Sequence, residues 1–325
     1  MSLKRLSPLF AAAFLVLMFS GRAAAQDRPA ATVGRYRLQS NPWVNLHQRL
    51  LYEAQFKWDR PPAGLSADGL AKWAKAVEDY RAYVKRRNPV FDDELARLND
   101  ALAVTNSDKL PASIPAAAAK VLEASMPLYR AAQWEEDDRA NRFWIALAVT
   151  LLASAGEELA EAHAKAYGVP FPTKILVDVT SFGWRVGAYT VREGAAAHCV
   201  IASTSKGTQG FAALESLMHE PSHVIVDAEE GAIGTELKRA AAETGLKPEP
   251  TLWHAILFYT AGELTRRALA RRGVEYEPYI LGMYERGFQG FRHALETHWQ
   301  AYLDGKLSRD EAVKQILVET SQTKK

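Results

Sequence analysis

The chain has 325 residues, 40 basic and 38 acidic side chains, and a single cysteine, Cys199. This near-balanced charge gives no electrostatic reason to expect binding to nucleic acid or to an anionic membrane, and one cysteine excludes an intrachain disulfide. Stability must therefore come from a hydrophobic core, which a chain of this length can build.

The first 25 residues have the pattern of a secretory signal peptide. Lys4 and Arg5 precede an apolar run at residues 9–19, and small residues lead up to a cleavage site between Ala25 and Gln26. The run is too short to span a membrane comfortably. Removing the segment with its three basic residues leaves 37 basic against 38 acidic side chains. We expect an exported protein, periplasmic or secreted, with no membrane span after cleavage.

Helical periodicity dominates the first half of the chain. Residues 26–40 show no periodicity and are expected to form a flexible lead-in. From residue 41 onward, apolar side chains recur every three to four residues, as in amphipathic helices. Helices are expected at residues 41–58, 66–87, 92–104, 116–132 and 135–167. The centre of the last one, residues 143–155, is apolar on all sides and is expected to be a buried core helix. Residues 41–172 are therefore predicted to form an all-helical lobe.

The sequence changes character at residue 173. Three short segments rich in β-branched residues, punctuated by glycines, predict a small, mostly antiparallel sheet; they are residues 175–180, 188–191 and 198–202. Helical patterns then continue to the C-terminus, where Ser308 and Glu311 have the spacing of a capping box. The predicted fold is α+β and predominantly helical, with the second lobe at residues 173–325.

A candidate metal-binding motif follows the predicted strands. Within residues 211–227, His219, Glu220 and His223 form the pattern H-E-x-x-H. Residues four apart lie on the same face of a helix, so the two histidines could hold one metal ion, and Glu220 could reach a water molecule on it. Neutral imidazoles, an open position and a nearby carboxylate are what zinc-dependent hydrolysis requires.

A catalytic zinc needs a third protein ligand. The favoured candidate is Glu263 on the following helix, because residues 258–262 before it are apolar or small; the ordinary alternative is a surface glutamate paired with Arg266 or Arg267. His254 lies on the same helix, nine residues earlier. At about 100° per residue it is half a turn out of phase with Glu263, so the two cannot both face one metal.

A third candidate is Glu229, which stands where the extended motif H-E-x-x-H-x-x-G-x-x-H has its last histidine. Val226 replaces the glycine of that motif, so this candidate is weaker than the other two. The motif itself also holds Pro221, whose missing N–H leaves the Leu217 carbonyl without its usual helical partner.

The sequence H-E-P-S-H, followed some forty residues later by a helical glutamate, resembles the gluzincin group of zinc metallopeptidases; the resemblance covers residues 173–273. It implies that His219, His223 and Glu263 hold zinc and that Glu220 acts as the general base on the zinc-bound water. It also implies a peptide or small protein as the substrate, paired with an edge strand of the sheet.

Two other functions are compatible with the same residues. One is a non-catalytic helical binding or scaffold protein with a degenerate zincin site, which Pro221 and the uncertain third ligand favour. The other is a zinc amidase or esterase that acts on a non-peptide substrate. The first predicts no turnover on any peptide, and substrate profiling would separate the second from a peptidase.

Overall fold

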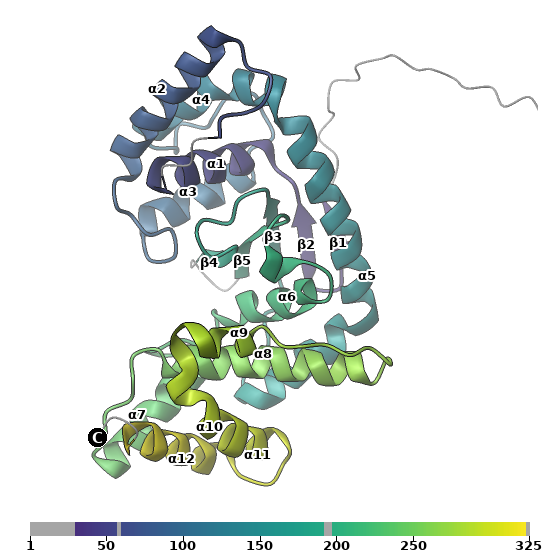
Figure 1. Ribbon diagram of the computed structural model, residues 1–325, viewed down its shortest axis with the longest axis vertical. Coiled ribbons are helices and arrows are strands. Elements are labelled where there is room, and N and C mark those ends of the chain that lie inside the picture. The colour runs from purple at the N-terminus through teal and green to yellow at the C-terminus, as the bar shows by residue number, and fades with distance from the viewer. Residues whose placement is uncertain (1–29, 57–59, 192–196, 323–325) are drawn as a thin grey trace, which may run out of the picture.

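The computed structural model describes residues 30–56, 60–191 and 197–322 (Figure 1). The predicted signal peptide and its cleavage site lie outside these ranges. The strands are β1 (Ala31–Val33), β2 (Tyr36–Gln39), β3 (Ile175–Thr180), β4 (Ala188–Val191) and β5 (Ala197–Ala202). The helices are α1 (Pro42–Phe56), α2 (Ala67–Val84), α3 (Asp93–Ala103), α4 (Ala116–Ala132), α5 (Trp134–Tyr167), α6 (Ala212–Ser222), α7 (Ala232–Thr244), α8 (Leu252–Ala270), α9 (Ile280–Met283), α10 (Arg292–Ala294), α11 (Gln300–Leu303) and α12 (Arg309–Gln322). The predicted α+β, predominantly helical fold is confirmed.

The strands form one five-stranded sheet with the order β1-β2-β3-β5-β4. The central pairings, β2 with β3 and β3 with β5, are parallel, whereas the outer strands β1 and β4 pair antiparallel with their neighbours. The sheet is therefore mixed, and the expectation of a mostly antiparallel sheet is wrong. The chain leaves β3, forms the edge strand β4, and returns between the two as β5, which makes β3 and β5 parallel.

Strands β1 and β2 correct the prediction that residues 26–40 form only a flexible lead-in. They contain three and four residues, which is too short for a period-two pattern to stand out. Their stability comes from a distant partner, because Tyr36 pairs with Ile175 and Leu38 pairs with Val177 across the parallel β2–β3 ladder. The N-terminal segment thereby completes the sheet that carries the site.

Helices cover both faces of the sheet. Alternate residues of β3 and β5 point to opposite sides, as in any strand. One face, which includes Val177 and Cys199, shares a hydrophobic core with α5, α6 and α8. On the other face, Val200 packs with Ala96 of α3, and Leu176 packs against the core of α1 to α4. The site-bearing helix α6 therefore rests on a sheet that is supported from behind by the N-terminal helices.

The predicted helices of the first half are confirmed as α1 to α5. Apolar side chains from α1 to α4, with Trp134 at the start of α5, form a core of their own; its largest fully buried members are Trp43, Trp73, Tyr80 and Tyr129. Helix α5, by contrast, contributes Trp144, Leu152 and Leu159 to the sheet core, so packing does not follow the predicted lobe boundary at residue 172. The division into separate domains remains a prediction.

Helix α5 is buried on one face only, which corrects the expectation for residues 143–155. Trp144 is 2 % exposed, but the neighbouring Phe143 is 79 % exposed. Among the described residues, α5 is the one helix long and apolar enough to cross a membrane by length and composition, and half of its most apolar window is buried. A soluble core helix passes the same test. Gly168 ends α5 in a left-handed conformation with φ of 69°, as its glycine predicts.

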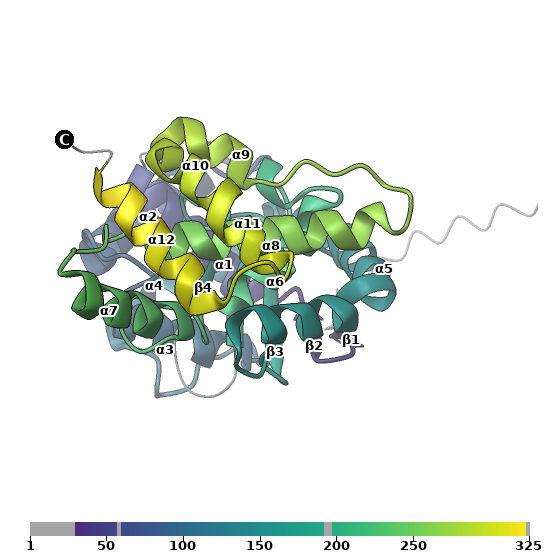
Figure 2. The ribbon, with the colours of Figure 1, turned by 90° about the horizontal axis from the view of Figure 1, so that it is seen from below.

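The C-terminal helices form a third core beside α8. Helix α12 lies against α7, and both pack near α8 and the short helices α10 and α11 (Figure 2). Trp299 is fully buried there and donates its indole N–H to the hydroxyl of Thr260 on α8. This assembly fixes α8 from the side opposite to α6, so α8 cannot move away from the motif helix without disrupting two cores.

A buried charged group ties α3 to the sheet. His198 on β5 contacts the carboxylates of Asp100 on α3 and Asp178 on β3, at 2.6 Å from Nδ1 and 2.8 Å from Nε2. Burial alone would lower the pKa of His198, but the hydrogen bonds to Asp100 and Asp178 outweigh it and raise the pKa to about 9. The imidazolium therefore donates from both nitrogens and neutralises the buried carboxylate of Asp178.

This arrangement predicts a pH-dependent stability. Because the pKa of His198 is raised in the folded state, its contribution is complete below its ordinary pKa of 6.5 and is lost as the pH rises through about 9. At pH 6, His198→Gln should lower the free energy of unfolding by about 1–3 kcal/mol, and the difference from wild type should shrink towards pH 10. Urea unfolding followed by tryptophan fluorescence measures both values. An equal difference at the two pH values would contradict the imidazolium assignment.

Candidate metal centre

Helix α6 presents two of the predicted ligands. His219 lies in its last turn, and His223 is the residue that caps its C-terminus. The Nε2 atoms of the two rings are 3.2 Å apart. The spacing of H-E-x-x-H thus brings both imidazoles to one point, as helical geometry predicts.

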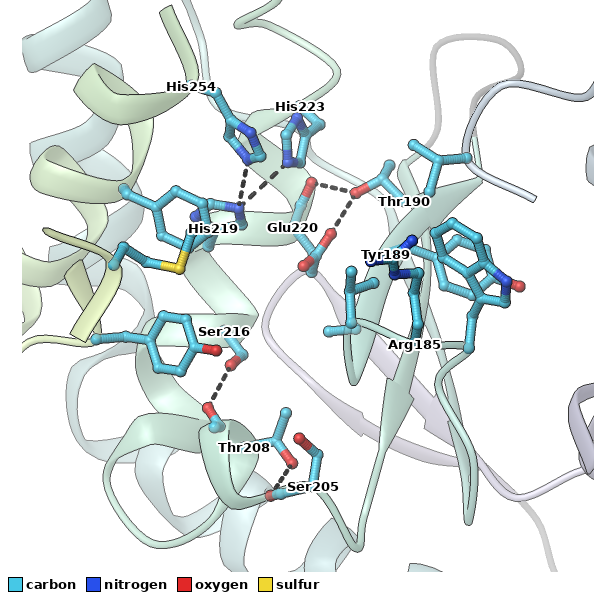
Figure 3. Close-up of a pocket in the computed structure, with 18 of the residues that line it drawn as sticks. Arg185, Tyr189, Thr190, Ser205, Thr208, Ser216, His219, Glu220, His223 and His254 are labelled. Carbon is cyan, nitrogen blue, oxygen red and sulfur yellow. Dashed lines mark hydrogen bonds between the residues drawn. The ribbon is translucent and has the colours of Figure 1, made fainter. Parts of the chain in front are cut away.

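Helix α8 supplies the third ring. The Nε2 atom of His254 is 3.4 Å from Nε2 of His219. The three histidines offer ligand atoms that all lie within 4.8 Å of one another, and among the described residues they form the cluster that could hold a metal ion. Figure 3 shows the three rings gathered beside Glu220, with Thr190 on its other side.

The spacing of these nitrogen atoms suits zinc. Ligands at 2.0–2.1 Å in a tetrahedral arrangement are about 3.3 Å from one another, and three protein ligands leave the fourth position open. The separations of 3.2 Å and 3.4 Å around His219 match this value. Burial, and then the neighbouring rings of His223 and His254, lower the pKa of His219 well below its ordinary value. Its ring is therefore neutral, which is the form that binds metal.

His219 is held by packing more than by a second hydrogen bond. Its ring centroid lies 4.1 Å from that of Phe258 on α8. Its Nδ1 atom is buried and has no hydrogen-bond partner within the described part of the chain. Metal-binding histidines usually donate this second N–H to an acceptor, so the site departs from the common arrangement at this atom.

The structure places Glu263 elsewhere and corrects its prediction as the third ligand. Its carboxylate accepts hydrogen bonds from Arg266 and Arg267, both at 2.7 Å. His254 faces α6, and Glu263, nine residues later on α8, projects from the opposite side of the helix. The residue of α8 that lies beside the two motif histidines is therefore the alternative candidate, His254. The ordinary interpretation of Glu263, an ion pair with its neighbouring arginines, is the one that the structure bears out.

Glu229 is also outside the cluster. It lies in the loop after α6, where Asp227 accepts backbone N–H groups of Glu229 and Glu230 and closes a tight turn. The side chain of Glu229 is 84 % exposed and lies 3.7 Å from the ammonium group of Lys238. The glycine that would turn this segment back towards the motif is absent at Val226, as the sequence indicates.

Glu220 stands between the histidines and the sheet. Its Oε2 atom lies 2.9 Å from the hydroxyl of Thr190 on the edge strand β4, and the same hydroxyl is 2.6 Å from the Glu220 carbonyl. Burial raises the pKa of Glu220 to about 7, while the contact with Thr190 opposes the shift. A carboxylate of this pKa can take up and release a proton near neutral pH. Sequence reasoning missed Thr190, because one threonine in a strand carries no signal.

Pro221 does not break α6. Pro221 has no N–H to donate to the Leu217 carbonyl. This carbonyl instead accepts a hydrogen bond of 2.8 Å from the buried hydroxyl of Tyr36 on β2. The helix then continues one more residue to Ser222, and the N–H of His223 bonds to the carbonyl of Glu220. A side chain from the sheet thus replaces the backbone donor that proline removes, and both imidazoles keep their helical spacing.

A pocket of about 490 Å³ opens onto the cluster. Helix α6 forms its floor, and β4 with the loop before it forms one wall (Figure 3). The opposite wall comes from α8 and the segment after it, and it is largely aromatic. Its members are Trp253, Phe258, Tyr279, Met283 and Phe288. The histidines and Glu220 therefore face a space large enough for part of a peptide or a small molecule.

No protein-family model, curated protein sequence or solved structure matches this chain. The assignment of the site therefore depends on its own geometry.

The role of Tyr36 is testable by a double-mutant cycle. Tyr36→Phe leaves the Leu217 carbonyl buried without a donor and should lower the free energy of unfolding by about 1–2 kcal/mol. In a Pro221→Ala background the same change should cost less, because alanine restores the backbone N–H at that position. Urea unfolding of the four proteins gives the coupling energy. If the two changes are additive, Tyr36 does not compensate for Pro221.

Proposed function

We propose that this protein is an exported zinc-dependent hydrolase that acts on peptide bonds. The observation that carries the proposal is the convergence of three imidazole rings, those of His219, His223 and His254, next to the buried carboxylate of Glu220. These residues fit a catalytic zinc site, which has three protein ligands and one open position. The resemblance to gluzincins supports the same chemistry, with a histidine in place of the glutamate as third ligand.

The roles of the residues follow from their positions. His219, His223 and His254 would hold the zinc, which when bound polarises a carbonyl group and makes water acidic enough to attack at neutral pH. Glu220 would accept the proton of the attacking water and pass it to the leaving amine. Thr190 would orient the Glu220 carboxylate by its hydroxyl contact. The aromatic wall would exclude water from the reacting groups.

The edge strand β4 supports a peptide substrate. It is one of the two edge strands of the sheet, opposite β1, and it lines the pocket through Ala188, Tyr189 and Thr190. The carbonyl of Gly187 accepts a hydrogen bond from the N–H of Ala202 on β5. In an antiparallel ladder every second residue bonds to the neighbouring strand, so Ala188 and Thr190 turn their N–H and C=O groups to the outer edge. An extended peptide can pair with these groups while its next amide reaches Glu220.

The metal assignment predicts zinc content. The purified protein should carry near-stoichiometric zinc that a chelator removes, and His219→Ala, His223→Ala and His254→Ala should each lose most of it. Glu263→Gln is the matched control on the same helix and should retain the metal. Elemental analysis after dialysis measures the content. Loss of zinc in the Glu263 variant with retention in the His254 variant would restore Glu263 as the third ligand.

The catalytic assignment predicts a separation between binding and turnover. Glu220→Gln should keep near-stoichiometric zinc and lower peptide hydrolysis by about a hundredfold to ten-thousandfold, the range for loss of a general acid–base group. Glu229→Gln, an exposed change in the nearby loop, should leave hydrolysis unaltered. The rate on a fluorogenic peptide library measures both. Full activity of the Glu220 variant would exclude the mechanism, and zinc without any turnover in the wild type would favour a binding protein.

A further inference from the structure

The pocket has a charge polarity that the zinc site does not require. Two of its lining residues are arginines, Arg185 in the loop before β4 and Arg286 after α9. Within the described residues, neither arginine forms a salt bridge, and each guanidinium stacks on an aromatic ring, Trp184 for Arg185 and Tyr279 for Arg286. Arg286 donates its Nε–H to the carbonyl of Gly282 at 3.1 Å, and its terminal nitrogen atoms, like the guanidinium of Arg185, can still bind a ligand.

The acidic side chains of the pocket lining do not neutralise these cations. They are Glu215 and Glu220, both buried on α6. Glu215 accepts hydrogen bonds from the hydroxyl of Tyr276 at 2.7 Å and from the N–H of Tyr279 at 3.1 Å. Glu220 is engaged by Thr190. The charge that the pocket offers to a ligand near the arginines is thus positive.

Both arginines lie at the same end of the pocket. Arg185 is two residues before Gly187, which lies next to Ser205. The guanidinium of Arg286 lies over the ring of Tyr279, and this ring is next to Gly207. Ser205 and Gly207 come just before α6, so this is the end where α6 begins. Figure 3 shows Ser205 on the side of the pocket away from His223 and His254, with Arg185 on the β4 side across the pocket from Glu220.

The other end of the pocket is acidic. Beyond the histidines, Phe91 and Trp253 line both this pocket and an adjoining one of about 380 Å³. The adjoining pocket is bordered by the loop that follows α6 and carries Asp227, Glu229 and Glu230. A ligand that spans the histidines therefore meets carboxylates on one side and guanidinium groups on the other.

This polarity matches one direction of a peptide on β4. Strand β4 starts beside Ser205 and continues to Thr190, which contacts Glu220. A peptide added antiparallel to β4 would place its carboxyl end at Arg185 and its amino end towards the acidic loop. A parallel peptide would have its ends the other way round, with its amino end at Arg185 and its carboxylate next to the acidic residues Asp227, Glu229 and Glu230.

We propose that the pocket binds short peptides that have a free α-carboxylate and a large apolar C-terminal residue. Arg185 and Arg286 would hold the carboxylate, and the apolar side chain of that residue would rest on the aromatic wall. This inference rests on the proposed peptide substrate and names its class. A guanidinium binds a carboxylate through paired N–H donors, and the aromatic rings offer apolar contact beside it. The arginines act in substrate specificity and do not touch the scissile bond.

The test uses binding without metal or turnover. N-acetyl-alanyl-phenylalanine and its C-terminal amide differ only in the carboxylate, and isothermal titration calorimetry on chelator-treated protein compares them. The acid should bind about tenfold more tightly than the amide, as loss of one charged hydrogen-bonded pair predicts. Arg185→Gln should remove this difference and leave binding of the amide unchanged. The matched control is Arg139→Gln, at an exposed arginine on α5 that pairs with Glu135. This variant should keep the difference of about tenfold in affinity between the acid and the amide.

The outcomes separate this inference from the proposed function. Equal binding of acid and amide, binding of neither, or an unchanged ratio in Arg185→Gln would overturn the carboxylate site, whatever the zinc content. A preserved ratio in a protein that holds no zinc would support the carboxylate site and contradict the hydrolase. In an active enzyme, Arg185→Gln should raise KM for the acid about tenfold with little change in kcat, because it removes binding and not chemistry.

Discussion

The site depends on a hydrogen bond that the sheet supplies where proline interrupts the backbone bonding of the motif helix. Proline in the last turn of α6 removes the donor for the Leu217 carbonyl, and the hydroxyl of Tyr36 supplies a replacement. Without it a buried carbonyl would be left unpaired, at a cost of about 1–3 kcal/mol. Because Tyr36 is on β2, the position of the histidines is linked to the N-terminal segment of the chain. The parallel pairing of β2 with β3 fixes that segment in register.

The second constraint is the support of α8 from both sides. One side of α8 packs on α5 and α6 within the sheet core, and the other belongs to the core of the C-terminal helices. His254 projects towards α6, while Glu263 projects towards Gln300, Arg267 and the α11 region. Rotation of α8 that brought Glu263 to the metal site would bury two arginines or expose Trp299. Packing far from the site thus decides which residue of α8 faces the motif histidines.

These constraints explain what the sequence predicts and what it does not. Helices and the H-E-x-x-H spacing are local properties, so α1 to α6, His219, Glu220 and His223 follow from periodicity. Helix phase shows that His254 and Glu263 cannot share a metal, but it does not show which face of α8 meets α6. Three features depend on partners that are distant in the sequence. The pairing of β2 with β3 joins residues more than a hundred positions apart, the parallel pairing of β3 with β5 joins residues about twenty apart, and the contact of Thr190 with Glu220 joins residues about thirty apart. No local pattern carries that information.

The arrangement of the three imidazoles is itself unfavourable for a protein without a ligand. Nε2 of His219 lies at hydrogen-bond distance from two other Nε2 atoms. An imidazole nitrogen has either one proton or one lone pair, so it can form only one good hydrogen bond of the two. Such a local conflict in an otherwise well-packed core is expected at functional sites. A divalent cation at the centre would resolve it by accepting all three lone pairs.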